Sequence, residues 1–164
     1  MKILLATVVA FIAPAAAHAA CTQVPIPETP KALLRAFSSR MENAGAGDWR
    51  FATDTGRGPM FYSKATVLRL VVKGTDGLIE EAGLFLPPEG TPADAARMEA
   101  AAAFLGAHIS GAAESSFQPR VVKAIADTRK DRQPHEVREG ETMLVFSSPA
   151  PGAVALVSGR LRCE

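Results

Sequence analysis

The chain has 164 residues, with 18 Lys and Arg against 17 Asp and Glu, and its formal net charge is +1. A near-neutral chain has no broad electrostatic field that would draw it to nucleic acid or to an anionic surface. We therefore expect no nucleic-acid partner. The length suits one domain with a single hydrophobic core.

The first residues carry the pattern of a secretory signal peptide. Lys2 gives a positive start, the uncharged and mostly apolar run 3–17 follows, and Ala17 and Ala19 are the small residues that a signal peptidase recognises. The run is too short to span a bilayer comfortably, so an uncleaved anchor is the less favoured alternative. We expect residues 1–19 to be removed. Residues 20–164 then form one periplasmic or secreted globular domain with no membrane span.

The two cysteines, Cys21 and Cys163, lie near the two ends of this domain. In an oxidising compartment such a pair most simply forms one disulfide bond. The chain-entropy model gives such a long loop a stabilisation of up to about 5 kcal/mol. Lipidation of Cys21 is the alternative, but His18 stands where a lipoprotein signal usually carries Leu, and a lipid would leave Cys163 without a partner.

Two helices are predicted from their start signals. Thr29 followed by a proline favours a helix that continues as an apolar stripe to Gly45. Thr91, again followed by a proline, has Asp94 three positions on, which is the pattern of a capping box. The alanine-rich run to about Ser110 then has high helix propensity.

A third helix is expected to open at Ser115 or Ser116. Its basic residues in the segment 129–132 suit the negative end of a helix dipole. Its apolar spacing predicts one buried stripe, made of Phe117, Val121, Ala124, Ile125 and Thr128.

The clearest strands are 66–73 and 78–86, which the Asp-Gly pair at 76–77 joins as a predicted hairpin. A two-residue turn there places Lys73 opposite Glu80, a favourable cross-strand pair.

Two further strands are expected, one over 135–148 and one over 153–163. In the last strand Cys163 alternates with Arg160 and Arg162. The arginines are interpreted as facing solvent, so Cys163 is expected to face the core.

The expected order is α-β-β-β-α-α-β-β, which does not alternate strand and helix. This order predicts an α+β fold, with a mostly antiparallel sheet of about five strands and three helices.

The segment from Trp49 to Tyr62 holds the only Trp, the only Tyr and two of the Phe residues. One interpretation is that these rings fill the core. The other is an exposed binding patch of Trp49, Arg50, Arg57 and Tyr62, because aromatic residues and Arg often anchor interfaces.

The residues that could carry metal or acid–base chemistry are few. Only His108 and His135 remain after signal cleavage, on different elements, so we expect neither a metal site nor a cofactor. Glu139 and Glu141 could share a strand face, but a solvated strand end explains them better.

These observations favour a non-enzymatic binding protein that acts on another protein or on an envelope component. One alternative is a small periplasmic hydrolase, in which His108 or His135 meets a serine or a carboxylate. The other is a carrier of a small apolar ligand, held in a cavity under the second helix. The sequence favours no particular oligomeric state.

Overall fold

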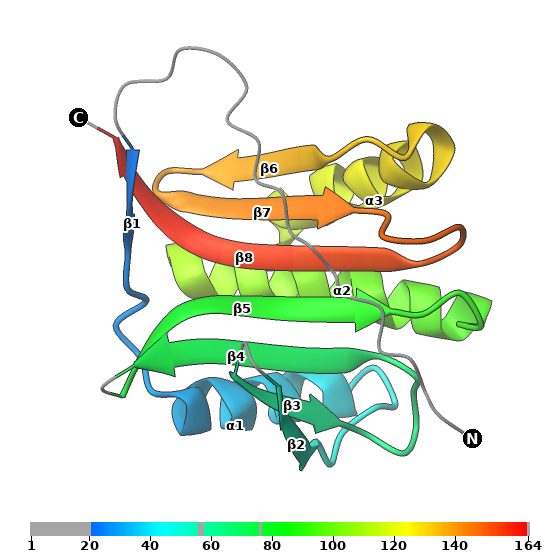
Figure 1. The fold of residues 1–164 in the computed structure, drawn as a ribbon, viewed down its shortest axis with the longest axis horizontal. Helices are drawn as coiled ribbons and strands as arrows, with labels where there is room; N and C mark the ends of the chain where they lie inside the picture. Colours follow the sequence, from blue (N-terminus) through cyan, green and yellow to red (C-terminus); the bar gives the residue numbers. More distant parts are fainter. Residues whose placement is uncertain (1–20, 56–57, 76, 164) are drawn as a thin grey trace.

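The computed structural model describes residues 21–55, 58–75 and 77–163, and the predicted signal peptide lies outside them. The described strands form one antiparallel sheet, and the described helices cover one of its faces (Figure 1). The predicted α+β class, with three helices and an antiparallel sheet, is confirmed.

The strands are β1 (Cys21–Val24), β2 (Arg50–Thr55), β3 (Gly58–Tyr62), β4 (Arg69–Thr75), β5 (Leu78–Leu86), β6 (His135–Glu139), β7 (Thr142–Ser147) and β8 (Val154–Cys163). The helices are α1 (Pro30–Glu42), α2 (Pro92–Ser110) and α3 (Glu114–Asp131). The strand order is β2-β3-β4-β5-β8-β7-β6, and β1 pairs with the end of β8.

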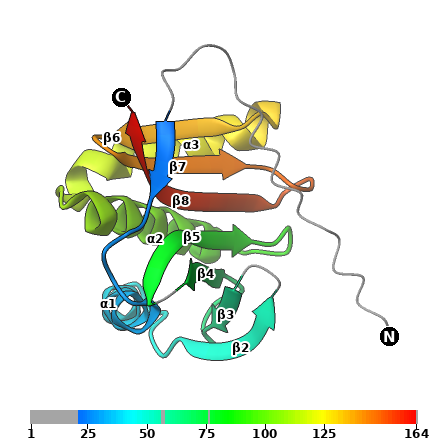
Figure 2. The ribbon, with the colours of Figure 1, turned by 60° about the vertical axis from the view of Figure 1, so that its left-hand side comes forward.

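The helix layer has α2 at its centre, in contact with β5, β7 and β8, and with α1 and α3 on its two sides (Figure 2). Every residue of α2 from 101 to 107 is buried. A Cβ at Gly106 would meet the Phe117 ring at 2.5 Å. The glycine is therefore needed for the close approach of α2 to α3, and the packing there is tight.

The predicted start signals of the first two helices are confirmed. Thr29 accepts a hydrogen bond from the Ala32 N–H at 3.2 Å. Thr91 and Asp94 form the capping box, each accepting from the other's backbone N–H, at 3.2 and 3.0 Å. The third helix starts earlier than predicted, at Glu114, but its predicted stripe is buried throughout.

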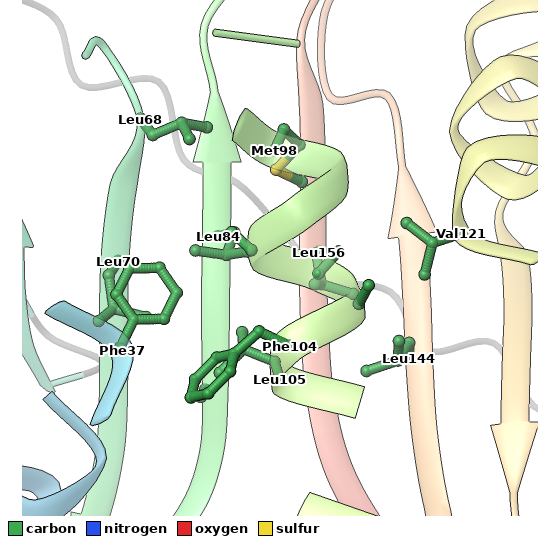
Figure 3. Packing of buried hydrophobic residues seen from close by; sticks show 14 of the residues in the cluster. Phe37, Leu68, Leu70, Leu84, Met98, Phe104, Leu105, Val121, Leu144 and Leu156 are labelled. Carbon is green, nitrogen blue, oxygen red and sulfur yellow. The ribbon is translucent and has the colours of Figure 1, made fainter. Parts of the chain in front are cut away.

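Leucines from adjacent strands form the floor of the core. Leu70, Leu84 and Leu156 are direct cross-strand neighbours on β4, β5 and β8. They point towards α2, which places Met98 and Leu105 over them (Figure 3). Each of these five side chains is at most 2% exposed.

A buried carboxylate joins the start of α2 to the neighbouring loops. Asp94 accepts hydrogen bonds from Thr66 Oγ1 and Thr91 Oγ1, both at 2.7 Å, and from Arg97 Nη1 at 3.2 Å. Arg97 Nε also donates to the Ala44 carbonyl. Burial alone would raise the pKa of Asp94, but the hydrogen bonds from Thr66, Thr91 and Arg97 hold this pKa well below its usual value.

The prediction of about five strands was wrong, because the described sheet has eight. The observed order is β-α-β-β-β-β-α-α-β-β-β. Part of the difference is the segment 135–148, which is a hairpin of β6 and β7 and not one strand. Gly140 makes the turn with φ +56°, a left-handed conformation that glycine adopts without strain. The rest comes from β1 and from the short β2–β3 pair.

The hairpin of β4 and β5 forms where it was predicted, although Asp76 lies outside the described residues. Gly74 pairs with Ile79 as a two-residue turn requires, but a bulge then shifts Lys73 to a position opposite Glu81. A Cβ at Gly74 would lie 2.2 Å from the Leu78 carbonyl oxygen, so the bulge depends on the glycine. Lys73 Nζ still reaches Glu80 Oε2 at 2.9 Å.

The predicted disulfide between Cys21 and Cys163 is confirmed. The two residues are directly opposite each other on β1 and β8, with an S–S distance of 2.01 Å and a Cα–Cα distance of 4.1 Å. The bond therefore holds the first described strand against the last one.

The face assigned to β8 was wrong. Val154 and Leu156 point to the helices, and Cys163 belongs to the alternate set on the opposite face. Arg160 and Arg162 share the helix-side alternation, but they lie at the strand end and pair with Glu141. The sequence pattern predicted the alternation of the β8 side chains correctly, but it assigned the two sets to the wrong faces of the sheet.

Candidate functional site

Trp49 is a core residue. Its side chain is 6% exposed, and its indole N–H donates to the Ala46 carbonyl at 2.6 Å. Its ring meets the Phe37 ring edge-on at a centroid distance of 5.0 Å, and Phe37 in turn packs on Phe104. Trp49 therefore ties α1 to the segment before β2, as the core interpretation predicted, and presents no ring to a partner.

Arg50 is exposed at the start of β2. Its Nε donates to both carboxylate oxygens of Asp48 at 3.0 Å. That hydrogen bond holds the pKa of the Asp48 carboxyl below its usual value. The side chains are 58% and 68% exposed, so solvent screens the pair, and it orients the guanidinium more than it stabilises the fold.

Tyr62 and Arg57 are the other two residues of the predicted patch. Tyr62 is half-buried on β3, opposite Arg50. It is also the cross-strand neighbour of Arg69 on β4, and it belongs to the sheet face that the helices leave uncovered. Arg57 lies outside the described residues. Whether these two residues bind anything stays a prediction.

Phe51 is the surface residue that the sequence analysis did not select. It is 60% exposed, the largest value among the exposed large hydrophobic residues of the described chain. Its ring meets the buried Phe61 ring edge-on at 6.3 Å across the β2–β3 pair. We call Arg50 and Phe51 the edge patch, because they are consecutive residues of β2, the last described strand at that edge of the sheet. Their side chains point to opposite faces of the strand, since Arg50 pairs with Tyr62 and Phe51 with the buried Phe61.

Each of the two histidines in the described residues, His108 and His135, meets a carboxylate. His108 Nε2 lies 2.7 Å from Glu28 Oε2, and its ring stacks on Phe104. His135 Nε2 lies 2.9 Å from Asp131 Oδ2, beside a surface depression of about 280 Å³. No serine hydroxyl is hydrogen-bonded to either ring in the described part of the chain, and the hydrolase alternative stays a prediction.

Glu139 and Glu141 line a second depression, of about 420 Å³, between the end of α2 and the β6–β7 turn. Glu139 pairs with Arg120 at 2.7 Å. Hydrogen bonds from Arg162 and then Arg160 hold the pKa of Glu141 below its usual value. An ionised carboxylate held by two arginines is a poor general acid at neutral pH.

Among the described residues, no group of three or more His, Cys, Asp or Glu side chains is arranged to hold a metal ion. None of the described helices is both long and apolar enough to cross a membrane.

Comparisons with protein-family models, with curated proteins and with solved structures found no match for this chain.

Proposed function

We propose that this protein is an exported binding domain, and that the edge patch of Arg50 and Phe51 contacts another protein or an envelope component. The single observation that carries the proposal is the exposure of Phe51, at 60%, on an edge strand and next in sequence to an exposed arginine. The signal-peptide pattern supports export. The disulfide between Cys21 and Cys163 is typical of proteins outside the cytoplasm.

The edge patch combines the features that anchor protein interfaces. A phenylalanine supplies a large apolar area, and an arginine supplies several hydrogen-bond donors in a planar group. Because β2 pairs with no described strand other than β3, its other side presents backbone groups that a partner can also bond. The contact between Phe51 and Phe61 holds the exposed ring against the sheet, so that less conformational freedom is lost on binding.

Recovery of partners from an envelope extract tests this function. We expect the wild-type protein to retain a partner, and expect Phe51→Ala and Arg50→Glu each to reduce its recovery at least about tenfold, the effect of losing one interface anchor. Val122→Ala is the matched control, because Val122 is also an exposed apolar residue, at 39%, but lies on α3.

The proposal fails if no partner is recovered while the pure protein converts an envelope substrate. It also fails if the Phe51 and Val122 variants behave alike. The carrier alternative has an observation against it, since the tight contact of Gly106 with Phe117 leaves no apolar cavity at that point under α2.

A further inference from the structure

Three polar residues form a row across β6, β7 and β8, on the side of the sheet that faces the helices. Glu139 and Arg160 are the direct cross-strand neighbours of Thr142, one on each side of it. All three line the depression of about 420 Å³ between the end of α2 and the β6–β7 turn (Figure 1). A carboxylate, a hydroxyl and a guanidinium therefore lie side by side in one depression.

The hydroxyl of Thr142 has no hydrogen-bond partner among the described residues, although the residue is only 2% exposed. In the described chain, Thr128 Oγ1 is the one side-chain oxygen that is both closed off from solvent and unpaired. Thr142 Oγ1 is therefore unpaired but accessible, and it opens into the depression that Thr142 lines. Because an unpaired hydroxyl in a buried residue is unfavourable, a ligand group that bonds it gains free energy.

The two charged residues of the row are each held by an ion pair that leaves other atoms unused. Glu139 Oε2 accepts from Arg120 Nη2 at 2.7 Å, whereas Glu139 Oε1 has no partner in the described part of the chain. Arg160 donates from Nη2 to Glu141, whereas its Nε and Nη1 have no described partner. The ion pairs orient both side chains in advance, so that less conformational freedom is lost when a ligand binds.

The two charged residues favour ligand groups of opposite sign. Glu141 is shared by Arg160 and Arg162, so two guanidinium groups face one carboxylate, and a second carboxylate from a ligand balances the charge. Glu139 Oε1 can accept from an ammonium. The last turn of α2 also lines the depression, and its carbonyl groups, at the negative end of the helix dipole, are further acceptors for an ammonium.

We propose that this depression binds a small zwitterion of the dipeptide class, with the carboxylate on Arg160 and Thr142 and the ammonium on Glu139. The backbones of Glu139 and Arg160 are two strand spacings apart, about 10 Å. An extended dipeptide spans about 7 Å, so the two side chains can reach its ends. Ile109 and Ala112 supply an apolar wall for short ligand side chains.

This site is separate from the edge patch. The row lies on β6, β7 and β8, whereas the edge patch lies on β2, at the opposite edge of the described sheet. The inference therefore goes beyond the proposed function and does not depend on it.

Isothermal titration calorimetry of the disulfide-bonded protein with L-alanyl-L-alanine tests the site. We expect one molecule bound per chain, with a dissociation constant below about 1 mM. The N-acetylated dipeptide lacks the ammonium, and the dipeptide amide lacks the carboxylate. Each should bind at least about tenfold more weakly, because each loses one charge-assisted contact.

Thr142→Val should weaken dipeptide binding at least about tenfold, because valine has nearly the shape of threonine but no hydroxyl to bond the ligand carboxylate. Its melting temperature should not fall, because the lost hydroxyl has no partner within the described fold. Thr128→Val is the matched control. Thr128 is also buried and unpaired, but it lies on α3 and does not line the depression. This variant should leave the dissociation constant unchanged.

A dissociation constant above about 1 mM for the dipeptide overturns the proposal without any variant. Equal binding of the dipeptide and its two blocked forms overturns it as well, because the charges of the row then play no part. A Thr142→Val variant that binds like the wild type, or no better and no worse than Thr128→Val, has the same consequence.

Discussion

The two faces of the sheet differ although the same strands form both. On β8, Leu156 is 1% exposed under α2, whereas its neighbour Val157 is half-buried and points to the open face, the face of the sheet that no described helix covers. The covered face is an interior with leucines and phenylalanines in contact with the helix layer (Figure 3). The open face also has apolar residues, but no element of the described chain packs on them. The first face therefore holds the core, and the second is left uncovered by the described elements.

The charged residues of the two faces differ in the same way. On the covered side Asp94 is 4% exposed and fully hydrogen-bonded by its neighbours. On the open face Arg69 and Glu81 have no ionic partner within the described chain. Buried charges require partners within the fold, whereas half-exposed charges can take theirs from another molecule.

The largest expected effect comes from placing the same charge on each face. Leu156→Lys should abolish folding or cost more than about 4 kcal/mol, because it buries an unpaired ammonium under α2. Val157→Lys should cost about 1 kcal/mol or less, since its long stem can lead the charge to solvent. Urea unfolding followed by Trp49 fluorescence measures both. Equal losses of stability in the two variants would contradict the assignment of Val157 to an uncovered face.

Removal of the disulfide should have the next largest effect. With both Cys21→Ser and Cys163→Ser, we expect the free energy of unfolding to fall by about 2–5 kcal/mol, because the unfolded chain is no longer closed into a loop. The fluorescence of native Trp49 should not change, since this ring packs on Phe37 and Ala46 and not on β1. Reduction of the wild-type protein should give the same loss, and a loss of under about 1 kcal/mol would contradict the prediction.

Asp94 gives a smaller and pH-dependent effect on the covered side. Asp94→Ala should cost about 3 kcal/mol at neutral pH, because Thr66, Thr91 and Arg97 lose a buried partner. The pKa of Asp94 is lowered by folding, so its stabilisation is fully present above the unfolded pKa, near 3.8, and is lost as the pH falls through the lower folded pKa. The difference between wild type and variant should shrink below about pH 4.

The control for Asp94 is Asp127→Ala. Asp127 forms an ion pair with Lys123 on the surface of α3, so its removal should cost less than about 1 kcal/mol at any pH. A wild-type-to-variant difference for Asp94 that stays constant down to pH 2 would contradict the assigned role of its carboxylate.

Local sequence signals were enough to predict the helices and the disulfide. Thr29 and Thr91 with their following prolines mark helix starts through backbone and side-chain chemistry within a few residues. The strands were predicted less well. Gly140 divides 135–148 into two strands, but a single glycine in a polar segment gives no strong turn signal. The strand β1 has only four residues and is defined by its pairing with β8, which is 142 residues away at the disulfide.

The candidate site was predicted only in part, for a related reason. Whether an aromatic ring is exposed depends on where its strand lies in the sheet, and the sequence does not give the strand order. Trp49 precedes β2 and packs beneath α1, whereas Phe51, two residues later, extends from the edge of the sheet. The side chains that share the uncovered sheet face, such as Arg69 and Glu81, likewise became visible only with the register of β4 and β5.

The Cys21–Cys163 bond also determines how the domain responds to mechanical tension. It closes the residues between the two cysteines into a covalent ring, and β1 and β8 meet at its junction. A pull applied through the residues outside this ring passes across the sulfur–sulfur bond and does not load the sheet or the helices. The oxidised domain should therefore stay folded under stretching forces that would peel β1 from β8 in the reduced form. Single-molecule force spectroscopy with and without reductant would show this as an unfolding event present only after reduction.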